Sequence, residues 1–131
     1  MAEPARAKPK PTPETQHFWD GTQAGELRLQ RCDACANVYF PPRPFCPSCA
    51  SRKVSVFKAS GKGKLYSYVI NHRPAAPGFT PPYAIAVVEL DEGPRMITNI
   101  VNPDAGIAAE KPVTLRIEDE HGVALARFAL T

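Results

Sequence analysis

The sequence predicts a mainly β protein, with a short N-terminal helix, a metal-binding ribbon and then a small barrel of five to six strands. Three observations predict it. Four cysteines form two Cys-x-x-Cys pairs, short alternating strands separated by turn residues follow Arg52, and a helix-start pattern precedes both. With 131 residues, the chain has room for one ordinary domain, or for one small domain with a metal-stabilised appendage.

The cysteine spacing predicts a structural zinc site. Ten residues separate Cys32 and Cys35 from Cys46 and Cys49, and the chain has no other cysteine. Two such pairs place four thiolates around one Zn²⁺, as in a rubredoxin-like pair of knuckles. A disulfide framework is the weaker alternative, because secreted scaffolds usually spread their cysteines along the chain. Four thiolates leave no open coordination position, and free thiols fit a cytoplasmic location.

The N-terminal region predicts a tether followed by a helix. Residues 1–13 are rich in Pro, Ala and Lys, which is typical of a flexible tail or of a linker to a preceding domain. Thr12 followed by Pro13 is a helix-start pattern, and we expect the helix over 14–26. It carries an aromatic pair that must be buried on its own domain or on a partner.

From residue 27 onward the pattern is that of strands. Residues 27–52 are expected to form the zinc ribbon, and residues 53–131 a separate barrel domain. Strands are expected near 54–59, 64–71, 83–91, 95–101, 113–118 and 123–129. The run Gly61-Lys62-Gly63 predicts a bulge or sharp bend at a barrel corner. Five or so antiparallel strands in so short a segment favour a small closed barrel, for which the OB fold is the natural candidate.

The sequence argues against catalysis, nucleic-acid binding and a membrane span as the main role of this chain. The three histidines are separated along the chain, and no Ser/His/Asp order or glycine-rich phosphate loop follows a strand, so no catalytic residue is predicted. The net charge is +3, of which the first ten residues supply +2, so nucleic acid is an unlikely main partner. No apolar run approaches the roughly 20 residues of a membrane span.

Several motifs occur in an order that resembles a known family. They are Phe18-Trp19-x-Gly21, Gly25-x-Leu27-x-Leu29-Gln30-Arg31-Cys32-x-x-Cys35, Phe40-Pro41-Pro42-Arg43-x-x-Cys46-Pro47-x-Cys49, Ser60-Gly61-Lys62-Gly63-x-Leu65-Tyr66-Ser67-Tyr68 and Pro77-Gly78-Phe79-x-x-Pro82-Tyr83. The chain resembles the zinc-ribbon/OB-fold acyl-CoA-associated proteins, catalogued as domain of unknown function thirty-five. One departure is that Ala36 and Ala50 stand where a glycine often follows each knuckle. Alanine is costly there if φ is positive.

The resemblance implies a non-catalytic accessory subunit of a thiolase-fold acyl-CoA enzyme. The foremost candidate partner is a lipid-transfer-protein-like aldolase that cleaves a hydroxyacyl-CoA in steroid side-chain degradation, and the alternative is an acyl-CoA thiolase or synthase. The chemistry and the acyl-CoA then belong to the partner of a hetero-oligomer, and this chain stabilises it and shapes the acyl-CoA entrance. An acyl-CoA hydratase domain, fused or associated at the N-terminus, is a further expected partner. A single-stranded nucleic-acid-binding OB module remains the alternative class.

Two surfaces are candidates for contacts with such a partner. The segment 83–90 is apolar on both faces, and a small barrel has one core, so one face needs covering by the chain itself or by another protein. The expected docking surface comprises Phe18, Trp19, Ala84, Ala86 and Val88. Since Lys and Arg are the usual phosphate ligands, contacts to CoA phosphates are expected from Lys62, Lys64 or Arg73.

Overall fold

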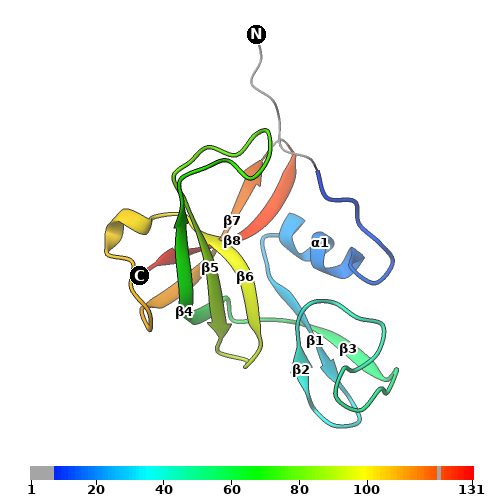
Figure 1. Ribbon diagram of the computed structural model, residues 1–131. Helices are drawn as coiled ribbons and strands as arrows, with labels where there is room; N and C mark the ends of the chain where they lie inside the picture. Colours follow the sequence, from blue (N-terminus) through cyan, green and yellow to red (C-terminus); the bar gives the residue numbers. More distant parts are fainter. Residues whose placement is uncertain (1–7, 121) are drawn as a thin grey trace.

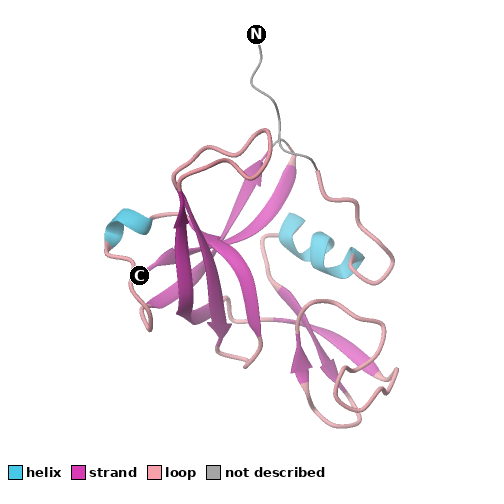
Figure 2. Ribbon diagram, viewed as in Figure 1, coloured by secondary structure: helices cyan, strands magenta, loops and turns pink. Residues whose placement is uncertain are grey.

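The computed structural model describes residues 8–120 and 122–131, and it confirms the predicted fold class. One short helix, a three-stranded ribbon sheet and a closed five-stranded barrel follow one another along the chain (Figure 2). The ribbon lies beside the barrel, and helix α1 lies in the angle between them (Figure 1). Most of the tether expected at 1–13 lies outside the described residues. No helix in the described part of the chain is long and apolar enough to cross a membrane.

Helix α1 is shorter than expected and spans Gln16–Gln23. Thr12 does not cap it. Its carbonyl instead accepts the Thr15 N–H at 3.0 Å, and this local turn delays the helix start. The helix ends in a Schellman motif, in which Gly25 has φ +84° and the Glu26 N–H bonds the Gly21 carbonyl at 2.9 Å. Gly25 is needed there because the left-handed conformation disfavours a side chain.

The ribbon sheet contains one strand that the sequence assigned to the barrel domain. Strands β1 (Arg28–Cys32), β2 (Val38–Tyr39) and β3 (Val54–Lys58) are ordered β2-β1-β3. The assignment of 54–59 to the barrel domain is therefore wrong, since β3 pairs antiparallel with β1 along its whole length. This pairing sets Phe57 opposite Leu29, and Phe57 packs at the border of the core while Leu29 is buried in it.

The barrel closes in the strand order β4-β5-β6-β8-β7. Its strands are β4 (Lys62–Asn71), β5 (Tyr83–Leu90), β6 (Arg95–Ile100), β7 (Pro112–Glu120) and β8 (Val123–Leu130), with the 3₁₀ turn η1 (Pro103–Ala105) before β7. Strand β7 pairs back onto β4, and β6 meets β8 in parallel where Ile100 faces Phe128. The Thr98 hydroxyl, which donates to the Ala126 carbonyl at 2.7 Å, reinforces that seam. The chain bends at Gly61, where φ is +77°, as one of the two predicted alternatives had it, and the bulge lies further along β4 at Tyr66, where the β4–β5 register shifts.

One continuous core joins the barrel to the ribbon. Phe128, Leu65 and Val88 are fully buried in the barrel, and Leu27 and Leu29 from the ribbon end of the chain belong to the same buried cluster. A small barrel buries only a limited apolar area, so sharing side chains with the ribbon enlarges the core. The two parts therefore support each other, and loss of structure in the ribbon is expected to weaken the barrel.

Part of the predicted docking surface is wrong. Ala84, Ala86 and Val88 are at most 1% exposed and point into the barrel, so they are not available to a partner. The outward face of β5 carries the larger side chains of Ile85 and Val87, which are only partly buried. The alternation was read correctly, but the face was reversed. Small side chains fit the narrow interior of a five-stranded barrel, while larger ones are accommodated outside.

Helix α1 contributes a pH-sensitive group. His17 is partly buried, and its Nε2 has no hydrogen-bond partner among the described residues. Burial, followed by the positive charge of Arg28, lowers the pKa of His17 below 6.5, against an opposing effect of Asp20. The unfolded chain therefore binds this proton more readily than the folded chain does. As the pH falls below 6.5, protonation of His17 should lower the free energy of unfolding, so the protein becomes less stable.

This pH dependence is expected to weaken in His17→Asn, which keeps a polar side chain without a titrating group. Urea unfolding of both proteins at pH 7.5 and pH 5.5 measures the difference. The control is His72→Asn, because His72 is exposed in the loop after β4. Equal acid sensitivity in the parent and His17→Asn would contradict the assignment.

Candidate metal centre

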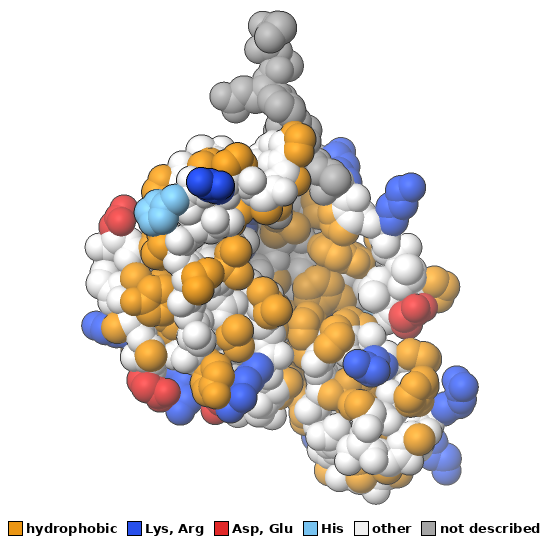
Figure 3. Space-filling model, viewed as in Figure 1, with side chains coloured by type: hydrophobic (Ala, Val, Ile, Leu, Met, Phe, Trp, Pro, Cys, Tyr) orange, Lys and Arg blue, Asp and Glu red, His pale blue; other side chains and the backbone are white. Residues whose placement is uncertain are grey.

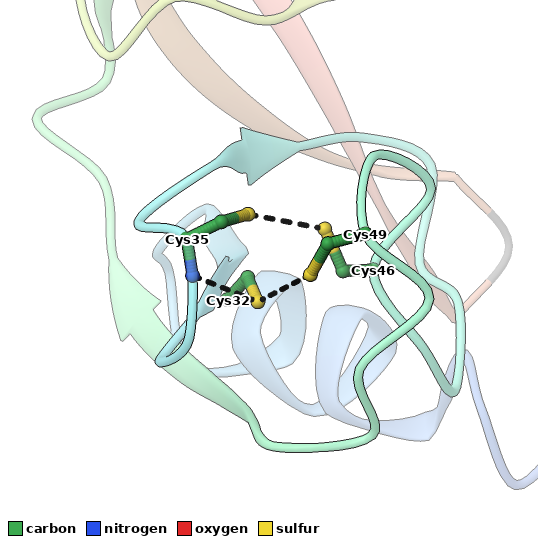
Figure 4. Close-up of side chains that lie close together, drawn as sticks. All are labelled: Cys32, Cys35, Cys46 and Cys49. Carbon is green, nitrogen blue, oxygen red and sulfur yellow. Dashed lines mark hydrogen bonds between the residues drawn. The ribbon is translucent and has the colours of Figure 1, made fainter.

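The side chains of the four cysteines point toward one another within the ribbon (Figure 4), and their Sγ atoms all lie within 4.8 Å of one another. The Sγ atoms of Cys32 and Cys49 are 3.5 Å apart, and those of Cys35 and Cys46 are 3.6 Å apart. A disulfide requires about 2.05 Å, so these are four free thiols. A tetrahedral zinc with Zn–S bonds of about 2.3 Å spaces its sulfurs about 3.8 Å apart. The donor set fits zinc, and the predicted structural zinc site is confirmed.

The two knuckles have the same backbone hydrogen bonds. In the first, the Ala36 N–H bonds the Cys32 carbonyl at 2.8 Å; in the second, the Ala50 N–H bonds the Cys46 carbonyl at 2.9 Å. Each turn directs its N–H groups toward sulfur, as Ser48 does to Cys46 Sγ at 3.3 Å. The backbone therefore forms both halves of the site alike and supplies donors to the thiolates.

These donors favour the thiolate form of Cys46. Burial alone raises the pKa of Cys46, but the N–H groups of Cys49 and Ser48 lower it to about 6. Asn37 adds a side-chain N–H 3.8 Å from the same sulfur. Such outer contacts orient a ligand and increase its affinity for the metal. The sequence reasoning missed Asn37, although an amide next to a knuckle is an available donor.

A second missed residue is Gln30, which fixes the loop between the knuckles. Its buried amide accepts the Arg43 N–H at 2.8 Å and donates to the Arg43 carbonyl at 3.0 Å. The Tyr39 hydroxyl donates to the same carbonyl at 3.2 Å. Because these bonds pair the backbone groups of Arg43, they hold the loop that brings Cys46 back to Cys32.

The alanines after the knuckles are strained, as the sequence suggested. Ala36 has φ +65° and Ala50 has φ +63°, which costs a residue with a side chain about 1 kcal/mol or more. We expect Ala36→Gly to stabilise the ribbon by about 0.5–1 kcal/mol, after allowing for the greater entropy of glycine in the unfolded chain. Thermal unfolding of the zinc-loaded protein measures it.

The matched control is Ala34→Gly in the same knuckle, where φ is not positive. Glycine at position 34 has no strain to relieve, so Ala34→Gly should lower the free energy of unfolding by about 0.5–1 kcal/mol. If both substitutions shift the stability in the same direction, the strain at Ala36 is not the cause.

The basic residues considered for CoA phosphates do not form one cluster. Lys62 and Lys64 lie on the exposed face at the start of β4, and Lys64 pairs with Glu110 at 3.1 Å. Arg73 follows the other end of this strand, about 30 Å away by the length of an extended chain. A phosphate contact from either end stays a proposal, and the two ends cannot bind the same phosphate.

The aromatic pair on α1 lies beside the barrel. Phe18 packs against the core and contacts Phe40, with ring centroids 5.6 Å apart. Trp19 meets Phe18 edge-on at 4.9 Å and lines an open groove toward β6. The pair is thus partly covered by its own chain, and the rest of Trp19 remains accessible.

Comparisons with known families follow the same division into ribbon and barrel. Residues 19–55 match the model described as ChsH2, rubredoxin-like zinc ribbon domain, and residues 58–118 match ChsH2, C-terminal OB-fold domain. The solved structure titled Ltp2-ChsH2(DUF35) aldolase superposes with a TM-score of 0.84 at 35% identity, covering 94% of this chain and 98% of that one. The chain belongs to the DUF35 family. The family recognised from the motifs is therefore confirmed.

Three curated relatives of this DUF35 chain are named as subunits of acyl-CoA enzymes, and others are named as DUF35 domain-containing scaffold proteins. The 3-oxo-4,17-pregnadiene-20-carboxyl-CoA hydratase alpha subunit of Mycobacterium tuberculosis is 39% identical over 110 residues, and the probable enoyl-CoA hydratase alpha subunit of Thermomonospora curvata is 40% identical. These matches span 83% and 82% of this chain but only 35% and 33% of the relatives' own lengths. The benzoylsuccinyl-CoA thiolase subunit BbsA of Thauera aromatica is 28% identical, covering 81% of this chain and 76% of BbsA.

Proposed function

We propose that this chain is a non-catalytic accessory subunit of a thiolase-like aldolase that cleaves a hydroxyacyl-CoA, with a steroid side chain as the acyl group. The observation that carries the proposal is the structural match to the Ltp2-ChsH2(DUF35) aldolase over nearly the full length of both chains. The hydratase alpha subunit named for a pregnadiene carboxyl-CoA supports the steroid assignment.

The metal centre supports a structural role rather than a chemical one. Its four thiolates fill the coordination shell of zinc and leave no position for water or a thioester. In the proposed complex the partner supplies the catalytic residues and binds the acyl-CoA. This chain stabilises the partner and narrows the acyl-CoA entrance, where either Lys62 and Lys64 at one end of β4 or Arg73 at the other end approaches the CoA phosphates. We place the complex in the cytoplasm, where thiols stay reduced.

A hydratase domain is the second proposed partner. Relatives named as hydratase alpha subunits are about three times as long as the segment they share with this chain. A fused or associated hydratase would supply the hydroxyacyl-CoA that the aldolase consumes. A thiolase in place of the aldolase is the alternative function, which the likeness to the thiolase subunit BbsA supports.

Reconstitution with a thiolase-like subunit tests the proposal. We expect the two chains to co-purify as a hetero-oligomer by size-exclusion chromatography with light scattering. Cleavage of a steroid hydroxyacyl-CoA should require both chains, and the isolated chain should give no turnover. Thioester turnover by the isolated chain, or salt-dependent retention on single-stranded DNA without binding to the thiolase-like subunit, would contradict it.

A further inference from the structure

An open apolar groove lies between α1 and the barrel. Its volume is about 180 Å³, and it separates Trp19 on the helix from Ile97 on β6. Phe18 and Phe40 line the groove beside Trp19, and Asn99 and Arg127 line its barrel side. Figure 3 shows the surface hollowed between β6 and α1, with hydrophobic side chains gathered there.

Ile97, at the border of this groove, is an exposed apolar side chain that nothing in the described part of the chain covers. It is 74% exposed, the highest value among the exposed large hydrophobic residues described. It faces outward from the middle of β6, opposite Val87 on β5. On the same face of β5, Ile85 lies opposite Val69 of β4, which is 59% exposed. A contiguous exposed apolar patch of this kind is typical of an interaction site.

A second, acidic pocket of about 500 Å³ adjoins the groove and shares Asn99 and Arg127 with it. Three consecutive acidic residues, Glu118 to Glu120, line it together with Arg127, which donates to Glu118 at 2.8 Å and to Glu120 at 2.5 Å. Asp119 is the exposed carboxylate of the three and is not paired with Arg127. The lining charge is therefore negative. Phe79 and Tyr83 form an aromatic wall with ring centroids 5.6 Å apart. Carboxylates beside aromatic rings attract a guanidinium or ammonium group.

We propose that the groove and the acidic pocket together bind one segment of the thiolase-like subunit. That segment places an apolar side chain between Trp19 and Ile97, and a neighbouring Arg or Lys side chain among the carboxylates of 118–120. The inference rests on the proposed function and specifies where the partner docks. Charge complementarity favours this occupant over a second copy of the chain. A two-fold interface centred on the groove would bring two acidic pockets close together.

Binding to the thiolase-like subunit tests the apolar half. Ile97→Asp should raise the dissociation constant at least tenfold, because it places a charge where an apolar side chain becomes buried in the interface. The control is Val56→Asp, another exposed β-branched strand residue, on the ribbon rather than the barrel, and it should bind within twofold of the parent. Zinc content and circular dichroism check folding. If the Ile97→Asp variant does not fold, the Ile97→Thr variant is measured in its place, and its dissociation constant should be at least threefold higher than that of the parent.

Salt dependence tests the acidic half. Asp119→Asn should make binding less sensitive to NaCl between 50 and 500 mM, because one carboxylate facing the partner's cation is lost. The control is Asp104→Asn in η1, an exposed carboxylate outside both cavities, and it should keep the parent's salt dependence.

The outcomes separate this inference from the proposed function. If the parent binds and the Ile97 variant binds equally well, the groove is not the docking site while the accessory role stands. If Asp119→Asn and Asp104→Asn have the same salt dependence, no basic residue occupies the pocket. If the parent does not bind at all, the proposed function and this inference fall together.

Discussion

Replacing Cys46 with serine is expected to abolish tight zinc binding and unfold the ribbon. A structural zinc contributes about 10–16 kcal/mol of apparent binding free energy in small zinc-finger peptides, and that energy is folding energy. Cys46 is fully buried, and three thiolates cannot complete the tetrahedron around the metal. Since Leu27 and Leu29 belong to the barrel core, the Tm of the whole chain should also fall. Zinc analysis and calorimetry measure both effects.

The control is Ser48→Ala, because Ser48 approaches the sulfur through its backbone N–H and keeps that bond as alanine. It should retain one zinc per chain and the parent's Tm. A chelator should reproduce the effect of Cys46→Ser on the parent protein. Acid should act in the same direction, because protons compete with zinc for the thiolates, so the stability from the metal is lost as the pH falls. A chelated protein with an unchanged Tm and ribbon would rule out a stabilising metal.

Gly63→Ala is expected to disrupt closure of the barrel. A Cβ at this position would lie 2.4 Å from the Glu89 carbonyl oxygen and 3.1 Å from the Leu90 Cα. Both neighbours are backbone atoms of β5, so no side-chain rotation relieves the clash. Gly63 also pairs with Val113 of β7, where β4 takes part in both neighbouring ladders. We expect a loss of about 3 kcal/mol, which lowers the Tm by about 10 °C.

The neighbouring substitution Lys62→Ala is the control for this effect. Lys62 lies on the same strand but is exposed, so its replacement should change stability by less than about 0.5 kcal/mol. Zinc content should stay at one per chain in both variants, which separates a barrel defect from a ribbon defect. Equal unfolding midpoints for the two variants would show that the close approach at Gly63 relaxes without cost.

The backbone conformation of the knuckles could be predicted from the sequence, whereas their contacts across the loop could not. The positive φ at Ala36 and Ala50 was anticipated from the family resemblance, because a glycine often follows each knuckle in the family and glycine is favoured where φ is positive. The contributions of Gln30 and Asn37 were not anticipated. Their partners Arg43 and Cys46 lie 13 and 9 residues away, across the loop, and no local pattern records such a contact.

By itself, the sequence determined the metal centre, the positions of the strands and the family. Each depends on spacing within a few residues: two Cys-x-x-Cys pairs, an alternation of apolar side chains, and motifs in a recognisable order. Only the tertiary structure decided which sheet β3 joins, which face of β5 points inward, and that Trp19 and Ile97 border one groove. These features depend on pairing between distant segments and on the width of the barrel interior, and an alternating strand is compatible with either face until its neighbours are in place.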